Sequence, residues 1–224
     1  SIAVVSDAGT PSVSDPGAEL GARRIAAGGA VAPTPGACAA VQALSACGFV
    51  GTEFRFVGFL PRTGKARRAK LAELIADEHA VVFYESPHRI LSTLEGLAAA
   101  GAAARSIVCA RELPKIHEAL ERGTVSAVAA AFAARVERGE SLRGEFTAVL
   151  GPLAAEELRA RDAEERDGAL ATARGELEAR IRGGESVSSA ARIVAKATGI
   201  PRGSLYRVAL EIQELEAAEE PPPG

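Results

Sequence analysis

The residues with the clearest capacity for chemistry lie where a buried strand pattern ends. Within five positions this stretch carries a carboxylate, a hydroxyl, an imidazole and a guanidinium, on Glu85, Ser86, His88 and Arg89. Glutamate and histidine can accept a proton, and arginine can bind phosphate. Capping the helix that follows requires only the hydroxyl of Ser86, with Pro87 at the first helical position. The remaining groups therefore indicate a functional site, although a lone histidine such as His88 is more commonly a solvated helix residue.

Two further segments concentrate charge. The string Ala110-Arg111-Glu112-Leu113-Pro114-Lys115 follows another strand pattern, and its alternative interpretation is a surface ion-pair cluster. The run 62–70, which includes Arg67 and Arg68, is basic at a predicted helix start, where the helix dipole favours acids. A phosphate contact would explain that placement, and a solvated basic face explains it equally well.

Two loops of small residues are candidates for a ligand site. Ser6–Gly17 follows an apolar run and precedes a helical pattern, and Pro33–Ala40 does the same. Strand-to-helix connections of this kind lie where open α/β sheets bind ligands. Small residues let the backbone approach a ligand closely, and the free amides of a helix N-terminus can bind it. For the second loop, an ordinary connection is the alternative.

Strand and helix patterns alternate along the first 150 residues. Strands are predicted at 2–6, 30–33, 54–60, 80–85, 106–110 and 145–151, and helices at 17–28, 37–46, 65–77, 87–100 and 125–138. This alternation predicts an α/β fold with a largely parallel sheet. The polar segment 116–124 is a candidate for an additional strand.

The composition changes after Pro152 to Ala, Glu and Arg. Residues 153–168 are predicted to form a charged linker or helix, and residues 169–216 a small helical module. Two of its short helices, joined by a tight turn near Gly199-Ile200-Pro201, resemble a helix-turn-helix. The tail, residues 217–224, is predicted to be disordered.

The composition bears on how the protein could bind nucleic acid, a metal ion or a membrane. The net charge of the 224 residues is −3, so any nucleic acid must be bound by local basic patches. Aromatic residues are only 4%, which argues against a stacking platform for single strands. The three cysteines, Cys38, Cys47 and Cys109, have no metal-ligand spacing and are interpreted as reduced thiols of a cytosolic protein. No metal site and no membrane span are expected.

Taken together, the loops Ser6–Gly17 and Pro33–Ala40, the strings Phe83–Arg89 and Ala110–Lys115 and the strand at Gly144–Gly151 resemble the tetrapyrrole-methylase-like (class III) S-adenosylmethionine methyltransferases. The closest resemblance is to the branch that methylates ribose in 16S ribosomal RNA. The resemblance covers about residues 1–216. It implies an N-terminally truncated class III fold in which 1–48 is the remnant of an N-terminal α/β domain and 49–152 a second α/β domain. Family members carry a further N-terminal stretch that forms one wall of the donor site.

The same resemblance implies a cofactor and its contacts. S-adenosylmethionine would lie in the cleft between the two domains, mostly against backbone and small side chains. The residues implied as its contacts are Gly9, Thr10, Pro11, Val13, Ala37, Cys38, Phe83, Tyr84, Ala110 and Thr147.

The implied reaction is methylation of the 2′-hydroxyl of cytidine 1402 in 16S rRNA, in the small ribosomal subunit. Glu85, His88 and Arg89 are then the catalytic candidates, with the identity of any general base left open. The candidates for binding substrate are Ser86, Arg67, Arg68, Arg111 and Lys115. A cytoplasmic homodimer with no membrane partner is expected.

Two other function classes remain open. One is a methylase of a tetrapyrrole precursor within the same superfamily. The other is an inactive, truncated remnant that binds RNA or dimerises.

Overall fold

The computed structural model describes residues 2–6, 9–49, 51, 53–113 and 118–219. It divides the chain into two compact units, residues 1–154 and residues 155–224. The first is an α/β unit and the second is helical, so the fold class predicted from the sequence is confirmed.

The first unit is built on a five-stranded sheet with the strand order β1-β2-β5-β3-β4. Its strands are β1 (Phe54–Phe59), β2 (Ala80–Glu85), β3 (Ser106–Arg111), β4 (Ala119–Thr124) and β5 (Phe146–Leu150). Only β1 and β2 pair in parallel, whereas β2–β5, β5–β3 and β3–β4 are antiparallel. The expectation of a largely parallel sheet was therefore wrong. The alternating pattern could not show that the last strand inserts between β2 and β3. The additional strand predicted in the polar segment 116–124 is confirmed as β4, which pairs antiparallel with β3.

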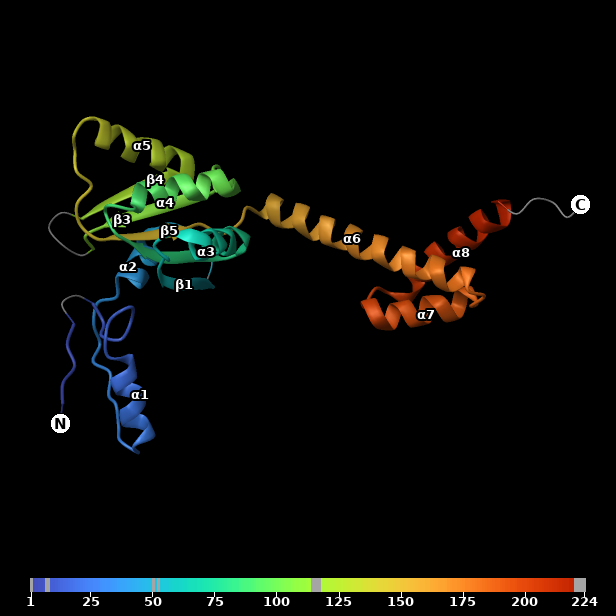
Figure 1. Ribbon diagram of the computed structural model, residues 1–224, viewed down its shortest axis with the longest axis horizontal. Coiled ribbons are helices and arrows are strands. Elements are labelled where there is room, and N and C mark those ends of the chain that lie inside the picture. Colours follow the sequence, from blue (N-terminus) through green and yellow to red (C-terminus); the bar gives the residue numbers. More distant parts are fainter. Residues whose placement is uncertain (1, 7–8, 50, 52, 114–117, 220–224) are drawn as a thin grey trace, which may run out of the picture. The chain divides into compact units, whose positions relative to one another are not determined.

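Helices cover both faces of this sheet (Figure 1). On one face lie α3 (Gly64–Ala76), α4 (Ile90–Leu97), its short extension η1 (Ala98–Ala102) and α5 (Val125–Glu137). On the other lies α2 (Ala39–Ala46), which packs through Ala40 and Ala43. Side chains of a strand alternate between faces, so Val81 and Phe83 enter the core under the three helices, while Val82 packs under α2.

The N-terminal part of the first unit contains one helix, α1 (Ala18–Ala26), and no strand among its described residues. The strands predicted at 2–6 and 30–33 are therefore not formed. A strand requires hydrogen bonds from a neighbouring strand, and neither segment has such a partner in the described part of the chain. No described residue before Ala40 is buried, so the expected remnant domain 1–48 has no core of its own.

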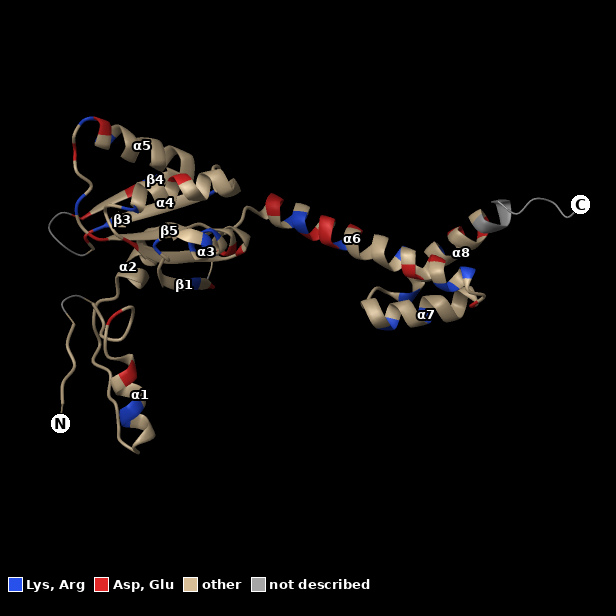
Figure 2. Cartoon of the chain, in the orientation of Figure 1, with Lys and Arg blue, Asp and Glu red and all other residues tan. Residues whose placement is uncertain are grey.

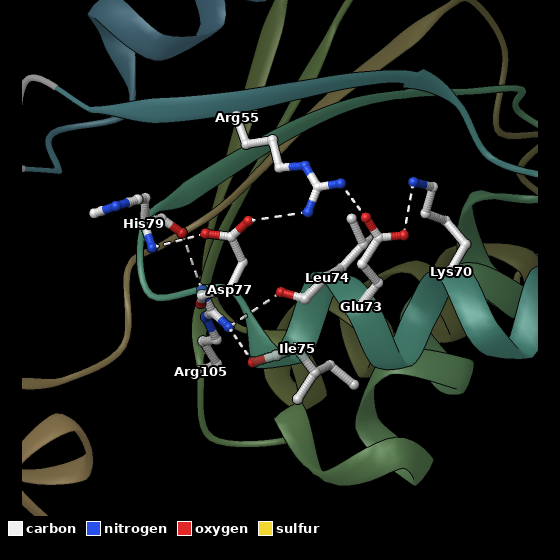
Figure 3. A network of polar contacts seen from close by, with 8 residues as sticks. All are labelled: Arg55, Lys70, Glu73, Leu74, Ile75, Asp77, His79 and Arg105. Atoms are coloured by element: carbon white, nitrogen blue, oxygen red, sulfur yellow. Dashed lines mark hydrogen bonds and ion pairs between the residues drawn. The ribbon is translucent and has the colours of Figure 1, made fainter. Parts of the chain in front are cut away.

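One buried side chain joins several elements of the first unit (Figure 3). Arg105 precedes β3 and is only 6% exposed. Its guanidinium donates hydrogen bonds of 2.6–3.3 Å to five backbone carbonyls, those of Leu74, Ile75, Asp77, His79 and Gly151. An arginine has five N–H donors, so this set matches its full capacity. The end of α3, the start of β2 and the end of β5 are thereby held at one point.

The second unit is formed by α6 (Ala155–Arg182), α7 (Val187–Thr198) and α8 (Arg202–Glu219). Its core consists of small and aliphatic side chains, Ala173, Leu177, Val187, Ala190, Ala191, Val194, Leu205, Ala209 and Ile212. The hydroxyl of Ser186 caps α7 by accepting a hydrogen bond from the Ser189 amide at 3.3 Å. Gly199, with φ of 73°, ends α7 in the left-handed conformation.

The segment predicted as a charged linker or helix, 153–168, is helical from Ala155 onward. Alanine, glutamate and arginine favour helix, and pairs such as Arg161–Glu165, at 3.5 Å, lie four residues apart. Of the predicted tail 217–224, residues 217–219 belong to α8 and the remaining residues lie outside the described part.

The contacts of Arg105 predict a large cost for its removal. Arg105→Leu would leave five carbonyls without their donor, and we expect a loss of about 3–5 kcal/mol in unfolding free energy. Arg105→Lys keeps the charge with fewer donors and should lose less. Urea denaturation followed by circular dichroism measures both, with Arg68→Leu on the exposed face of α3 as the matched control. Equal stability of the Arg105→Leu and Arg68→Leu variants would show that the carbonyls find other partners.

Candidate functional site

A cleft of about 320 Å³ opens on the α2 face of the sheet, within the first unit. Its floor includes Tyr84 of β2 and Thr147 of β5, which are direct cross-strand neighbours. Ala110 of β3 continues the same row on the other side of Thr147. Three residues that are far apart in the sequence therefore stand side by side because the register aligns them. They share a face because side chains alternate along each strand.

The walls of the cleft come from the two small-residue loops. Gly9, Thr10 and Val13 line it from the first loop, and Ala37 and Cys38 line it from the turn before α2. The two loops are joined, because the Thr10 hydroxyl donates to the carbonyl oxygen of Ala37 at 3.0 Å.

A glycine in β1 allows the first loop to lie close to the sheet. Gly58 has φ of 64° and lies at a register shift between β1 and β2. A Cβ atom at this position would come within 2.8 Å of the Ser14 hydroxyl. Ser12 and Ser14 themselves have positive φ angles of 71° and 59°, a conformation that non-glycine residues adopt at a cost. The cleft wall is therefore a shaped loop, held in a backbone conformation that needs support from its neighbours.

Tyr84 is fixed by aromatic neighbours and by the start of α2. Its ring makes edge contacts with Phe56 and Phe59, at centroid distances of 5.0 Å and 5.4 Å. Its hydroxyl lies near the Ala40 amide and the Cys38 side chain, and burial together with Cys38 raises the pKa of Tyr84 above its ordinary value. The phenol is therefore neutral near pH 7 and offers the cleft an aromatic surface with a hydroxyl at its edge.

The residues expected to contact a cofactor are thus placed in two groups. Those that line the cleft are Gly9, Thr10, Val13, Ala37, Cys38, Tyr84 and Thr147. Ala110 lies in the floor row but is almost fully buried, and Pro11 does not line the cleft. Phe83 is a correction: its fully buried side chain points to the opposite face, into the core under the three helices. Phe83 and Tyr84 are neighbours on β2, and successive side chains of a strand point to opposite faces of the sheet.

Glu85, the first catalytic candidate, is buried and surrounded by donors. It is 1% exposed. One carboxylate oxygen accepts the Ser86 amide at 2.8 Å and contacts Arg89 Nη2 at 2.5 Å. The other accepts the Thr93 hydroxyl at 2.8 Å and lies 3.6 Å from Arg67 Nη1. With both oxygens engaged and shielded from water, this geometry favours a positioning role for Glu85 over proton acceptance.

Arg89 and Ser86 belong to the same network, whereas His88 does not. Arg89 also donates to the Leu60 carbonyl at 3.3 Å and to the Ser86 hydroxyl at 3.4 Å. The Ser86 carbonyl accepts from the amides of Arg89 and Ile90, and α4 begins at Ile90, later than the sequence predicted. His88 is exposed on the intervening turn and does not line the cleft.

The residues expected to bind substrate are dispersed. Arg67 is largely buried, and its guanidinium donates to the Pro61 carbonyl at 3.2 Å and to the Thr93 hydroxyl at 2.7 Å. The structure therefore assigns its guanidinium to the Glu85 network, and a phosphate contact would require breaking those bonds. Arg68 is exposed on α3, Arg111 ends β3 opposite Phe146, and Lys115 lies outside the described residues.

The cleft is also lined by residues to which the sequence analysis gave no role. Asp15, Glu112 and Glu145 line the cleft and give it an acidic character. Gln42 also lines it, one helical turn after Cys38, and its side-chain oxygen is buried without a hydrogen-bond partner among the described residues. The spacing of four between Cys38 and Gln42 was the available signal, since it places both on one face of α2.

Other kinds of site find no support in the described residues. Cys38, Cys47 and Cys109 are free thiols, and burial raises the pKa of Cys109 to about 12. The described residues contain no group of three His, Cys, Asp or Glu side chains placed to hold a metal ion. None of the described helices has the length and apolar character needed to cross a membrane.

Two family models match parts of this chain. Residues 1–129 match the family model of the Tetrapyrrole (Corrin/Porphyrin) Methylases, and residues 175–213 match the model named RsmI C-terminal HTH domain. The crystal structure of the methyltransferase CobJ is similar over 65% of this chain and 62% of its own, with 20% identity and a TM-score of 0.49.

Curated relatives match most of the chain. The Ribosomal RNA small subunit methyltransferase I of Synechocystis is 38% identical over 212 residues, which are 95% of this chain and 72% of that protein. The protein of the same name from Escherichia coli O157:H7 is 38% identical over 95% of this chain and 70% of its own length. The chain thus spans about 70% of these relatives. It belongs to the ribosomal RNA small subunit methyltransferase I family, within the tetrapyrrole methylases.

Proposed function

We propose that this chain carries the donor cleft of an S-adenosylmethionine-dependent methyltransferase that methylates the 2′-hydroxyl of a cytidine ribose in small-subunit ribosomal RNA. The observation that carries the proposal is the cleft over the row Tyr84, Thr147 and Ala110, in a chain whose relatives are named ribosomal RNA small subunit methyltransferase I.

The chemistry of the cleft fits the donor. When bound, S-adenosylmethionine supplies a methyl group already activated by a sulfonium charge. The carboxylates of Asp15, Glu112 and Glu145 line the cleft, and carboxylates are groups that suit a cationic ligand. The volume of about 320 Å³ falls in the range of small-molecule pockets, and the small side chains of both loops leave room for backbone contacts. Gln42 supplies an acceptor for an N–H or O–H donor of the ligand.

The Glu85 network supports the cleft from behind. Glu85 holds Arg67 and Arg89 and so fixes the end of β2 from which Tyr84 enters the cleft. Alignment of the acceptor hydroxyl with the methyl group contributes much of the rate in a reaction whose donor is already activated. Of the two candidate bases, Glu85 lines the cleft but has both carboxylate oxygens engaged by donors, whereas His88 is exposed to solvent, and we assign the proton acceptor to His88.

Two finer points accompany this proposal. A homodimer stays a prediction, which light scattering can measure. A tetrapyrrole methylase is the competing function, and the match of residues 175–213 to the C-terminal model of the ribosomal family favours RNA. Tritiated methyl transfer to undermethylated small subunits and to a porphyrinogen separates the two: transfer to the porphyrinogen alone would refute the RNA assignment.

Gln42 provides a test of the donor site. Gln42→Leu removes the buried acceptor while keeping similar bulk, and we expect affinity for S-adenosylhomocysteine to fall about tenfold. Isothermal titration calorimetry measures the change. Ser45→Ala, on an exposed position of the same helix, is the matched control and should bind like the parent. Unchanged affinity in Gln42→Leu would place the ligand elsewhere in the cleft or outside it.

The pH dependence of methyl transfer and the stability of the variants distinguish the proposed role of His88 from that of Glu85. We expect His88→Ala to lower methyl transfer about 10²-fold and to flatten its rise with pH, because the variant lacks the group that accepts the proton. Glu85→Gln should keep that rise but lose about 3 kcal/mol of stability, because it breaks a buried ion pair. Rate profiles from pH 5 to 9 and thermal denaturation give both readouts.

The control for this pair is His79→Ala, an exposed histidine at the other end of β2. It should leave the pH profile unchanged. If Glu85→Gln instead loses the pH dependence and His88→Ala keeps it, Glu85 is the base. If neither variant affects transfer, the cluster has only a structural role.

A further inference from the structure

The second unit separates its charges along the sequence. Residues 186–210 contain four basic side chains and no acidic one, whereas residues 155–185 mix nine acidic with six basic side chains. Figure 2 shows both signs along α6 and only basic side chains on α7. Positive charge is therefore concentrated on α7 and the first half of α8.

Three arginines of α6 pair with neighbouring carboxylates. Arg174 pairs with Glu178 at 3.2 Å, and Arg180 pairs with Glu176 at 3.1 Å. By contrast, the basic residues of α7 and α8 form no ion pair with a carboxylate in the described part of the chain. They are Arg192, Lys196, Arg202 and Arg207. Their charge is thus available to an anionic partner.

Arg192, Lys196 and Arg202 lie on one surface, and Arg207 is exposed five residues after Arg202 on α8. Ser188, Arg192 and Lys196 are exposed and recur every four residues, which places them along one stripe of α7. Arg202, at the start of α8, reaches this stripe and donates to the Ser188 hydroxyl at 3.0 Å. We call Ser188, Arg192, Lys196, Arg202 and Arg207 the basic face.

The position of Arg202 is costly for the helix alone. A cation at a helix N-terminus opposes the helix dipole, and neither α7 nor α8 has an acidic residue in its first turn. One turn further along α8, Tyr206 is 39% exposed beside the basic residues. An exposed aromatic ring next to unpaired cations suits a nucleotide, because the ring can stack on the base while the cations bind the phosphate.

We propose that the basic face binds the sugar–phosphate backbone of RNA. The choice of RNA over DNA rests on the proposed function, whereas the phosphate contact rests on the charges alone. The deep, narrow major groove of an RNA helix excludes a protein helix, so α8 would contact phosphates and 2′-hydroxyls rather than base edges. Binding should therefore depend strongly on salt and weakly on base sequence.

The test measures the affinity of the full chain for a labelled stem–loop RNA between about 50 and 200 mM KCl. Each phosphate contact that is lost should reduce the slope of log K against log salt by about one. We expect Arg192→Gln/Lys196→Gln and Arg202→Gln/Arg207→Gln each to reduce it by about two. Arg174→Gln, in the same unit with its charge already paired to Glu178, is the matched control and should keep the parent's slope.

Two further arms separate this inference from the proposed function. Binding of S-adenosylhomocysteine should be the same in the parent and all variants, and a parent that fails to bind it while the slopes change refutes the proposed function alone. A DNA duplex of equal length should bind more weakly than the RNA, and tighter binding to DNA overturns the choice of RNA. If the double variants keep the parent's slope, the basic face does not contact phosphate.

Discussion

The buried carboxylate of Glu85 is the constraint on which the site depends. An ionised carboxylate away from water is tolerated only when donors surround it. Here the donors come from the Ser86 amide, from Arg89 and Thr93 on the following turn and helix, and from Arg67 on α3. The need to satisfy one charge therefore fixes the end of β2 relative to two helices. Through the carbonyls of Leu60 and Pro61, the same network also holds the end of β1.

Because side chains alternate along the strands, one face of the sheet forms the core and the other forms the floor of the cleft. Val81, Phe83 and Glu85 point toward the three helices, where large side chains fill a core and the carboxylate is enclosed. Tyr84 and Thr147 point the other way, toward a single alanine-rich helix and two loops of small residues. Rigidity behind one face supports an open cleft on the other. Arg105 supports the sheet in the same way at the opposite end of β2, by gathering five carbonyls from three elements.

The second unit differs from the first in its core and in the distribution of its charges. Its core is made of alanine and aliphatic residues that let three helices approach closely, and its polar surface is divided by sign. On α6, arginine and glutamate four residues apart stabilise a long helix whose first half contributes nothing to the core. On α7 and α8 the basic side chains lack such partners within the described residues, so their placement is explained by an external anion better than by helix stability.

Much of this protein follows from sequence alone, because the signals are local. Apolar runs identified β1, β2, β3 and β5, and helical patterns identified the helices. The turn near Gly199 separated α7 from α8, and the small-residue loops indicated the cleft. Tertiary structure decided what depends on distant partners. The strands predicted at 2–6 and 30–33 lack neighbours, β5 inserts antiparallel between β2 and β3, and Arg67 joins Glu85 across 18 residues of sequence. Whether Glu85 and Tyr84 share a face also could not be settled by their types. Both residues line the cleft, but the pleat of the strand turns the carboxylate of Glu85 toward the arginines and the ring of Tyr84 toward α2.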